Sequence, residues 1–102
     1  MIIRSNIGLL SISTTSINTF VSESQSSVLL AAANPFRSNI VIVNDSNKDM
    51  WINYDAAATN DHIKIAKGTS TDISNVKGAI YGIWASGANS GAFIIETSYD
   101  QD

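Results

Sequence analysis

The sequence predicts an all-β protein, either a small antiparallel β-sandwich or a jelly-roll-like barrel. Three observations lead to this prediction. Short apolar segments with period-two alternation recur along the chain, polar turns separate them, and no segment sustains the 3.6-residue repeat of an amphipathic helix. About seven short strands spaced in this way are typical of antiparallel sandwiches and small barrels.

The strongest strand signals lie in residues 34–54. Pro35 fixes its own φ and restricts the residue before it to extended geometry, so we do not expect a helix to enter this segment. The run at 40–43 is β-branched and apolar on both faces, which is typical of a central strand covered on both sides. A polar turn at 44–49 then leads to a second strand, residues 50–54. We expect the two strands to form a β-hairpin.

Five more strands are expected from alternation and β-branched content. Gly82 lies inside one of them, where a glycine often marks a bulge, a bend or a close neighbour. Alternation places Ile63 and Ile65 inward in another, and Lys67-Gly68 is the natural turn after it. The alanines of residues 28–33, the first of these five segments, leave a short helix possible there. These expected strands cover residues 28–33, 62–66, 71–73, 79–85 and 92–99.

Residues 1–27 are rich in Ser and Thr and carry isolated large apolar side chains without a helical repeat. This mixture favours extended conformations, whereas disorder goes with low hydrophobicity. We interpret the segment as an extended N-terminal arm in front of a β-sandwich domain of residues 28–102. Two ways of covering the arm's side chains stay open: packing across a subunit boundary, or pairing with the edge of the parent sheet.

The composition restricts the classes of partner. A chain of 102 residues has room for one domain with a small core. It is 44% hydrophobic and only 15% charged, against roughly 25% charged in an average soluble domain. Ser, Thr and Asn replace the missing charge, and because such side chains are desolvated at lower cost, extensive contact with other chains is expected.

Charge and hydropathy disfavour nucleic acid and membrane as partners. The net charge is −3 and the six basic residues are scattered, whereas a phosphate-binding surface needs clustered Lys and Arg. The longest apolar runs are far shorter than the ~20 residues of a transmembrane helix. The N-terminus lacks the pattern of a secretory signal, so we take a cytosolic origin as the default. With no cysteine, a disulfide framework or a thiolate metal site is excluded.

The search for reactive groups nominates no catalytic residue, metal site or cofactor. Residues 45–49 satisfy the first half of a calcium-loop pattern, but Met50 and Ala56 stand where glycine and the last acidic ligand are needed. A polar turn is the favoured interpretation of this stretch. His62 is the single histidine, and no nucleophile-elbow pattern surrounds any serine. We therefore do not expect an enzyme.

Aromatic residues and one arginine leave binding roles open. Arg37 follows Pro35 and Phe36 at the start of a strand, where its guanidinium could clamp a carboxylate or carbonyl groups, or could equally be solvated. Glu96 is the one carboxylate inside a strong strand and can pair with a Lys or Arg. The aromatic residues could form a sugar-stacking platform, although a place in the core or in an interface is favoured. These aromatic residues are Trp51, Tyr54, Tyr81, Trp84 and Tyr99.

Several short motifs follow one another between residues 34 and 96. They are Asn34-Pro35-Phe36-Arg37, Ile40-Val41-Ile42-Val43-Asn44, Met50-Trp51-Ile52-Asn53-Tyr54, Lys67-Gly68, Gly78-Ala79-Ile80-Tyr81-Gly82-Ile83-Trp84-Ala85 and Ile94-Ile95-Glu96. This order resembles that of small virion proteins of tailed bacteriophages, which share an N-P-x-R opening before a hydrophobic strand and a G-x-I-x-x-I-x-A strand before the last one. Relatives often carry Pro-Gly or Gly-Gly at the turn where this chain has Lys67-Gly68.

The resemblance implies a structural role in the virion, made in the cytoplasm of the host bacterium. It implies a capsid decoration or cement protein, or a related head or tail component, that bridges neighbouring shell subunits. The implied partners are the major capsid protein or other virion proteins and further copies of the chain, with a trimer favoured. The alternative is a carbohydrate-binding module or a tail or receptor-binding component. The candidate interface residues are Ile7, Leu9, Ile12, Phe20, Arg37, Trp51, Tyr54 and Trp84.

Overall fold

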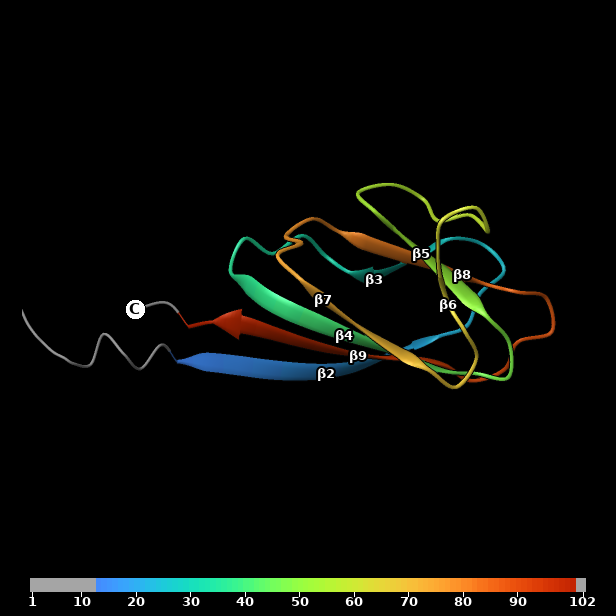
Figure 1. The fold of residues 1–102 in the computed structure, drawn as a ribbon, viewed down its shortest axis with the longest axis horizontal. Helices are drawn as coiled ribbons and strands as arrows, with labels where there is room; N and C mark the ends of the chain where they lie inside the picture. Colours follow the sequence, from blue (N-terminus) through green and yellow to red (C-terminus); the bar gives the residue numbers. More distant parts are fainter. Residues whose placement is uncertain (1–12, 101–102) are drawn as a thin grey trace, which may run out of the picture.

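A computed structural model describes residues 13–100, which form eight strands in two four-stranded antiparallel sheets (Figure 1). The first sheet has the strand order β2-β9-β4-β7 and the second the order β3-β8-β5-β6. The predicted all-β antiparallel sandwich is thereby confirmed. The strands are β2 (Thr14–Ser22), β3 (Val28–Ala31), β4 (Arg37–Asp45), β5 (Met50–Tyr54), β6 (Ile63–Ile65), β7 (Ser70–Ser74), β8 (Ile80–Trp84) and β9 (Gly91–Tyr99).

Successive strands mostly alternate between the two sheets. Only β5 and β6 are neighbours both in the chain and in a sheet, whereas every other pairing joins strands that are distant in sequence. Two four-stranded sheets connected in this way form a jelly roll, the double Greek key that recurs in viral capsid and lectin domains. The core lies between the sheets, because alternate side chains of each strand point to one face. Its members are Leu30, Ala31, Ile40, Ile42, Met50, Ile52, Ile65, Ile73, Ile80, Trp84, Ala92 and Ile94.

The predicted hairpin of residues 40–54 is wrong. β4 pairs with β7 and β9, whereas β5 pairs with β6 and β8 in the other sheet. The polar turn between β4 and β5 therefore carries the chain across the sandwich. Ile42 and Met50 are both fully buried, as they would also be in a hairpin, so alternation alone could not distinguish the two arrangements.

The N-terminal segment belongs to the sandwich from Thr14 onward. β2 pairs with β9 over its whole length, from Thr14 opposite Tyr99 to Ser22 opposite Gly91. Of the two arrangements left open by the sequence, the described part of the arm therefore adopts pairing with the edge of its own sheet. The domain boundary expected at residue 27 falls between two strands of one sandwich. Residues 1–12 lie outside the part of the chain that the structure describes.

The close neighbour expected at Gly82 is confirmed, whereas the inward position expected for Ile63 is wrong. The close neighbour expected at Gly82 is Leu30, whose Cδ1 atom would lie 2.8 Å from an added Cβ, and β3 shifts register beside it. Ile63 was expected to point inward with Ile65, yet it is 47% exposed while Ile65 is buried. β6 is a three-residue edge strand, so its first residue lies at the border of the core.

Gly91 provides a test of the pairing between β2 and β9. A Cβ atom at this position would overlap the carbonyl oxygen of Val21 in β2, and backbone cannot move aside as a side chain can. We expect Gly91→Ala to lower the free energy of unfolding by about 1–3 kcal/mol, the usual cost of overpacking, and the melting temperature by roughly 10 °C. Thermal unfolding followed by circular dichroism measures the effect.

Gly68→Ala is the matched control for that substitution. Gly68 has a φ of 70° and no atom near its Cβ position, so only the left-handed backbone geometry is penalised, at about 1 kcal/mol. A Gly91→Ala variant as stable as the parent protein would contradict the described packing of β2 on β9.

Candidate functional site

A buried cluster surrounds the guanidinium group of Arg37, which is only 1% exposed. Its Nε donates to Glu96 Oε2 at 2.7 Å, which forms an ion pair between β4 and β9. Its two other nitrogens donate to three main-chain carbonyl groups at 2.7–2.9 Å. These carbonyl groups belong to Ala32, Val76 and Gly78. Of the two interpretations of Arg37, the clamp on a carboxylate and on carbonyl groups is confirmed.

Neighbouring side chains complete this Arg37 cluster. Asn34 Nδ2 donates to Ser98 Oγ at 2.8 Å and to Glu96 Oε2 at 3.3 Å, and Lys77 Nζ donates to the carbonyl oxygen of Arg37. The cluster ties the loop before β4 and the loop before β8 to β9. Through these bonds the cluster holds the sandwich together. Because its arginine is almost inaccessible, Arg37 offers little surface to a partner chain.

A second buried polar group closes the opposite end of β4. Asn44 is fully buried, and its Nδ2 donates to the carbonyl oxygens of Lys48 and Ile65, both at 2.9 Å. Its Oδ1 accepts from Ser46 Oγ at 2.8 Å and from Trp84 Nε1 at 3.3 Å. Trp84 is 2% exposed and belongs to the core. Its expected role as an interface residue is thus limited by burial, because the indole already packs inside its own sandwich.

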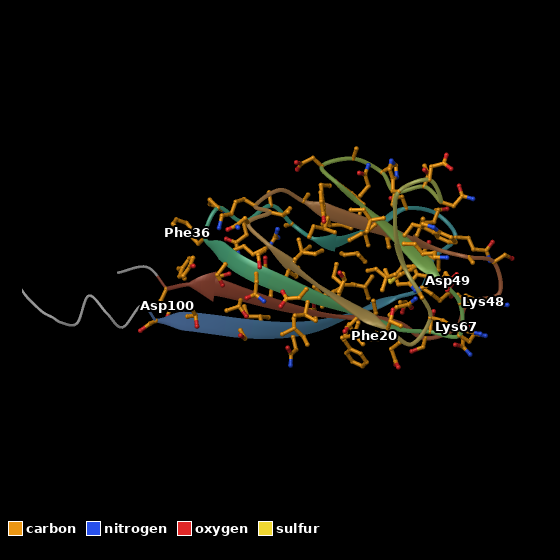
Figure 2. The ribbon with its side chains drawn as sticks, in the orientation of Figure 1. Phe20, Phe36, Lys48, Asp49, Lys67 and Asp100 are labelled. Carbon is orange, nitrogen blue, oxygen red and sulfur yellow. The ribbon has the colours of Figure 1, made fainter. Side chains whose placement is uncertain are left out.

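The remaining candidates separate onto different faces. Tyr54 is half-buried and packs against the core. Trp51 is half-buried on the outer face of the second sheet. Phe20 is 47% exposed and projects from β2 away from the second sheet (Figure 2). Ile7, Leu9 and Ile12 lie outside the described residues. The eight candidates therefore do not form one site.

An apolar patch occupies the outer face of the first sheet. The rings of Phe20 and Phe93, which face each other across β2 and β9, have centroids 5.1 Å apart. Phe93 is 43% exposed although it lies on an inner strand of its sheet. The register places half-buried residues of β4 and β9 next to the two rings on the same face. We call this patch the assembly face; it comprises Phe20, Val41, Val43, Phe93 and Ile95.

The rest of this outer face is almost uncharged. The outward positions of β2 and β7 carry mainly Ser, Thr and Asn. Asp45 and Asp72 are the charged side chains at outward positions of the four described strands; Asp72 accepts a hydrogen bond from Asn39 Nδ2 at 3.1 Å, and Asp45 lies at the end of β4. Covering such a face with another protein requires little desolvation of charge.

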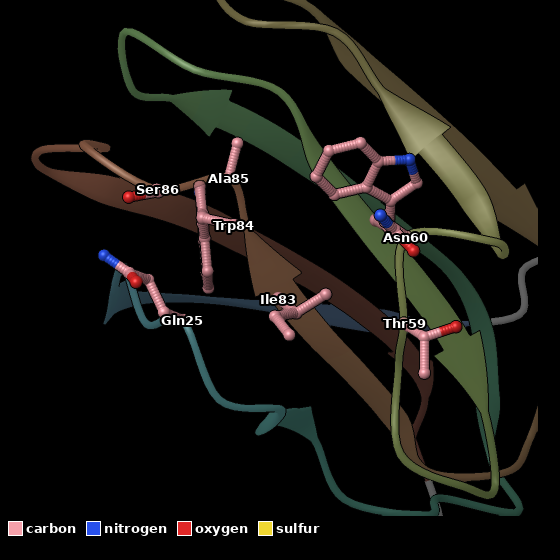
Figure 3. A pocket seen from close by; sticks show the side chains of 8 residues that line it. Gln25, Thr59, Asn60, Ile83, Trp84, Ala85 and Ser86 are labelled. Carbon is pink, nitrogen blue, oxygen red and sulfur yellow. The ribbon is translucent and has the colours of Figure 1, made fainter.

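A groove of about 460 Å³ lies on the other side of the molecule, over the outer face of the second sheet (Figure 3). Trp51 in β5 and Ile83 in β8 are direct cross-strand neighbours and form its apolar part. Polar side chains from three loops surround this part. We call this site the Trp51 groove; its lining residues are Gln25, Trp51, Thr59, Asn60, Ile83, Trp84, Ala85 and Ser86.

The loop of residues 55–62 forms one wall of the Trp51 groove. Asn53 Nδ2 donates to the carbonyl oxygen of Ala57, and the main-chain N–H of Ala58 donates to Ser27 Oγ at 2.9 Å. The main-chain N–H of Thr59 donates to His62 Nδ1, also at 2.9 Å. These bonds fold the loop toward the segment before β3. His62 is exposed and organises the loop from outside the groove.

The acidic turn of residues 45–49 has structural contacts of its own. Asp49 Oδ1 accepts from the main-chain N–H of Lys67, and Asp45 Oδ2 accepts from Ser90 Oγ. Within residues 13–100, no group of three or more His, Cys, Asp or Glu side chains is placed to hold a metal ion. Nor does this described part contain a helix long and apolar enough to cross a membrane.

Two features were missed by sequence reasoning. Phe93 was assigned to an alternating strand but was not selected as a surface residue; the signal was that both faces of β9 are apolar, with Ala92 and Ile94 buried. The polar rim of the groove comes from loops, whose approach to Trp51 depends on the tertiary fold. In the comparisons with known proteins, no family model matches this chain and no curated protein is significantly similar to it.

Proposed function

We propose that this protein is a non-enzymatic structural component of a tailed-phage virion, which decorates or cements the shell by bridging neighbouring shell subunits. Its partners are further copies of the chain, with a trimer favoured, and the major capsid protein or another virion protein. It is made in the cytoplasm of the host bacterium and is incorporated into the virion. The motif resemblance and the jelly-roll strand order, which recurs in capsid domains, support this proposal.

The assembly face is the observation that carries the proposal, because a fold alone does not define a function. Two exposed phenylalanine rings pack in a tilted arrangement, with centroids 5.1 Å apart, on a sheet face whose described strands carry two charged outward side chains, Asp45 and Asp72. Aromatic residues are enriched at the centres of interfaces, and charged residues are depleted there. A second copy of the chain fits these properties better than a charged ligand does.

The edge strand of the first sheet offers a second, separate apolar contact. Ile17 on β2 is 59% exposed and lies on the opposite face of the sheet from Phe20, because it pairs with Glu96 and not with an outward residue of β9. We expect the contacts through this edge and through the assembly face to be individually weak. Repeated over many copies on a shell, weak contacts of this kind add up through multivalency.

Substitution of the assembly face should dissociate the oligomer. We expect the parent chain to form an oligomer at micromolar concentration, and Phe93→Asp to convert it to a monomer, because a buried carboxylate without a partner opposes association. Size-exclusion chromatography with light scattering measures the mass. The matched control is Leu29→Asp, since Leu29 is 48% exposed and lies on the second sheet.

A parent chain that is monomeric at high micromolar concentration would contradict the assembly proposal, as would a Phe93→Asp variant that keeps the parent mass. Point substitutions are more informative here than deletion of residues 1–27, because that deletion also removes β2 from its sheet. The virion assignment is tested separately. We expect a major capsid protein gene beside the gene for this chain, and the chain itself in mass spectra of the purified virions.

A further inference from the structure

We infer that the Trp51 groove is a binding site for a neutral saccharide. This function goes beyond assembly, and it uses the sheet face opposite to the assembly face. The inference rests on the uncharged lining of the groove, on its apolar part formed by Trp51 and Ile83, and on the amide and hydroxyl groups at its rim.

The size and shape of the groove suit a small ligand. Its volume of about 460 Å³ is in the ~300–1,000 Å³ range of small-molecule sites. Trp51 and Ile83 stand side by side because they are direct partners in the β5–β8 ladder. The groove therefore has a base on two paired strands, which hold it more rigidly than loops alone would.

The rim offers hydrogen bonds of both polarities. Gln25 and Asn60 each present an amide that donates and accepts, and Ser86 presents a hydroxyl that does the same. Gln25 and Ser86 lie at one end of the groove and Asn60 at the other, with Ile83 between them (Figure 3). These three side chains form no hydrogen bond with another group of residues 13–100, so they are available to a ligand.

This combination matches the chemistry of a pyranose. A sugar ring has an apolar C–H face, which packs on an indole, and a periphery of hydroxyl groups, which donate and accept hydrogen bonds. An indole beside an aliphatic side chain, with amides and a hydroxyl around them, presents complementary groups to both parts. A purely apolar ligand would leave the amides at the rim desolvated and unpaired.

The charges near the groove disfavour an anionic ligand. None of the eight lining residues is a Lys or Arg, which a phosphate or a sulfate would need. The nearest cation in the sheet is Lys64, opposite Trp51 in β6. Lys64 Nζ lies 3.8 Å from Asp49 Oδ2, so this positive charge is already accompanied by a negative one.

The position of the groove is compatible with assembly. The assembly face is the outer surface of the first sheet, whereas the Trp51 groove is on the outer side of the second sheet. An oligomer joined through the assembly face would leave the groove of every copy exposed. Several weak saccharide sites on one particle would then bind a glycan-coated surface tightly.

The experiment combines a glycan array with a titration. The full chain is applied to an array of neutral and of sialylated or sulfated oligosaccharides, and the best neutral oligosaccharide is then titrated against tryptophan fluorescence. We expect binding to neutral glycans and a change in the emission of Trp51, since Trp84 is buried. Trp51→Ala should weaken binding at least about tenfold, because it removes both the stacking surface and its buried area.

Matched controls separate this inference from the assembly proposal. Asn60→Ala should also weaken binding, whereas Asn18→Ala, an exposed position on β2, should not. Circular dichroism verifies that each variant is folded. Phe93→Asp should keep the saccharide affinity per chain while losing the oligomer, and Trp51→Ala should do the reverse. Binding to charged glycans only, no signal on the array, or parent affinity in folded Trp51→Ala would overturn the inference.

Discussion

Arg37→Ala is expected to lower the free energy of unfolding by about 3–5 kcal/mol, the usual cost of removing one partner of a buried ion pair. The substitution leaves the Glu96 carboxylate without its cation and three carbonyl groups without their donors. A domain of this size is stable by only about 5–15 kcal/mol, so the variant should be largely unfolded or should melt more than 15 °C below the parent. Urea unfolding followed by tryptophan fluorescence measures the loss.

Three further variants identify the cause of that loss. Arg37→Lys should recover little stability, because one ammonium group cannot reach the carboxylate and all three carbonyl groups in the fixed geometry of a guanidinium. Glu96→Gln keeps an acceptor for Arg37 Nε and should cost less than Arg37→Ala. Lys67→Ala removes an exposed cation and should be nearly neutral. An Arg37→Ala variant with parent stability would show that the cluster does not hold the sandwich together.

The strands were predictable because their signals are local. Alternation in β5 and β9 reports which side chains face the core, and the polar stretches between strands report the turns. Predicted and observed bounds of β5 are the same, and those of β9 differ by one residue at its start. β4 is longer than its apolar run, since ladder pairing continues through the polar residues at both of its ends.

The pairing of the strands was not predictable from the same signals. β4 and β5 look like a hairpin because each buries alternate apolar residues and a polar turn joins them. In a jelly roll the same turn crosses between sheets, and the true partners of β4 are about 30 and 50 residues further along the chain. A period-two pattern shows which side chains face the core, but it does not show which distant strands pair with each other. The sheet position of β2 depends on such a distant partner as well.

The candidate surfaces were predictable only in part. Arg37 and Trp51 were selected for their chemistry, and the structure gives them opposite environments: a buried clamp and a groove on the surface. The sequence alone could not show that Arg37 would be buried and Trp51 would line a surface groove. Burial of a polar side chain depends on the groups that reach it from other strands. Phe93 shows the reverse case. Its strand is apolar on both faces, and only the tertiary fold reveals which face is uncovered.

Asn44→Ala is expected to lower the free energy of unfolding by about 2–4 kcal/mol. Its fully buried amide connects the turn after β4, the end of β6 and the indole of Trp84, through four hydrogen bonds of 2.8–3.3 Å. Removal of the amide takes a buried hydrogen bond from the carbonyl of Ile65 and from the indole N–H of Trp84, whereas the carbonyl of Lys48 keeps its bond from Ser46 Oγ. Each buried group left unpaired costs about 1–3 kcal/mol when water cannot reach it. Chemical unfolding of parent and variant measures the difference.

The identity of the atoms, and not only the volume of the side chain, should matter at this position. Asn44→Asp is nearly isosteric, but it replaces the donor to Lys48 O and Ile65 O with an acceptor. We therefore expect it to be at least as destabilising as Asn44→Ala at neutral pH, since a buried carboxylate would face two carbonyl oxygens. Asn18→Ala on the exposed side of β2 should change stability by less than about 0.5 kcal/mol. If Asn44→Asp were tolerated as well as Asn18→Ala, the turn between β4 and β5 would not depend on this amide, and the crossing between the two sheets would need another cause.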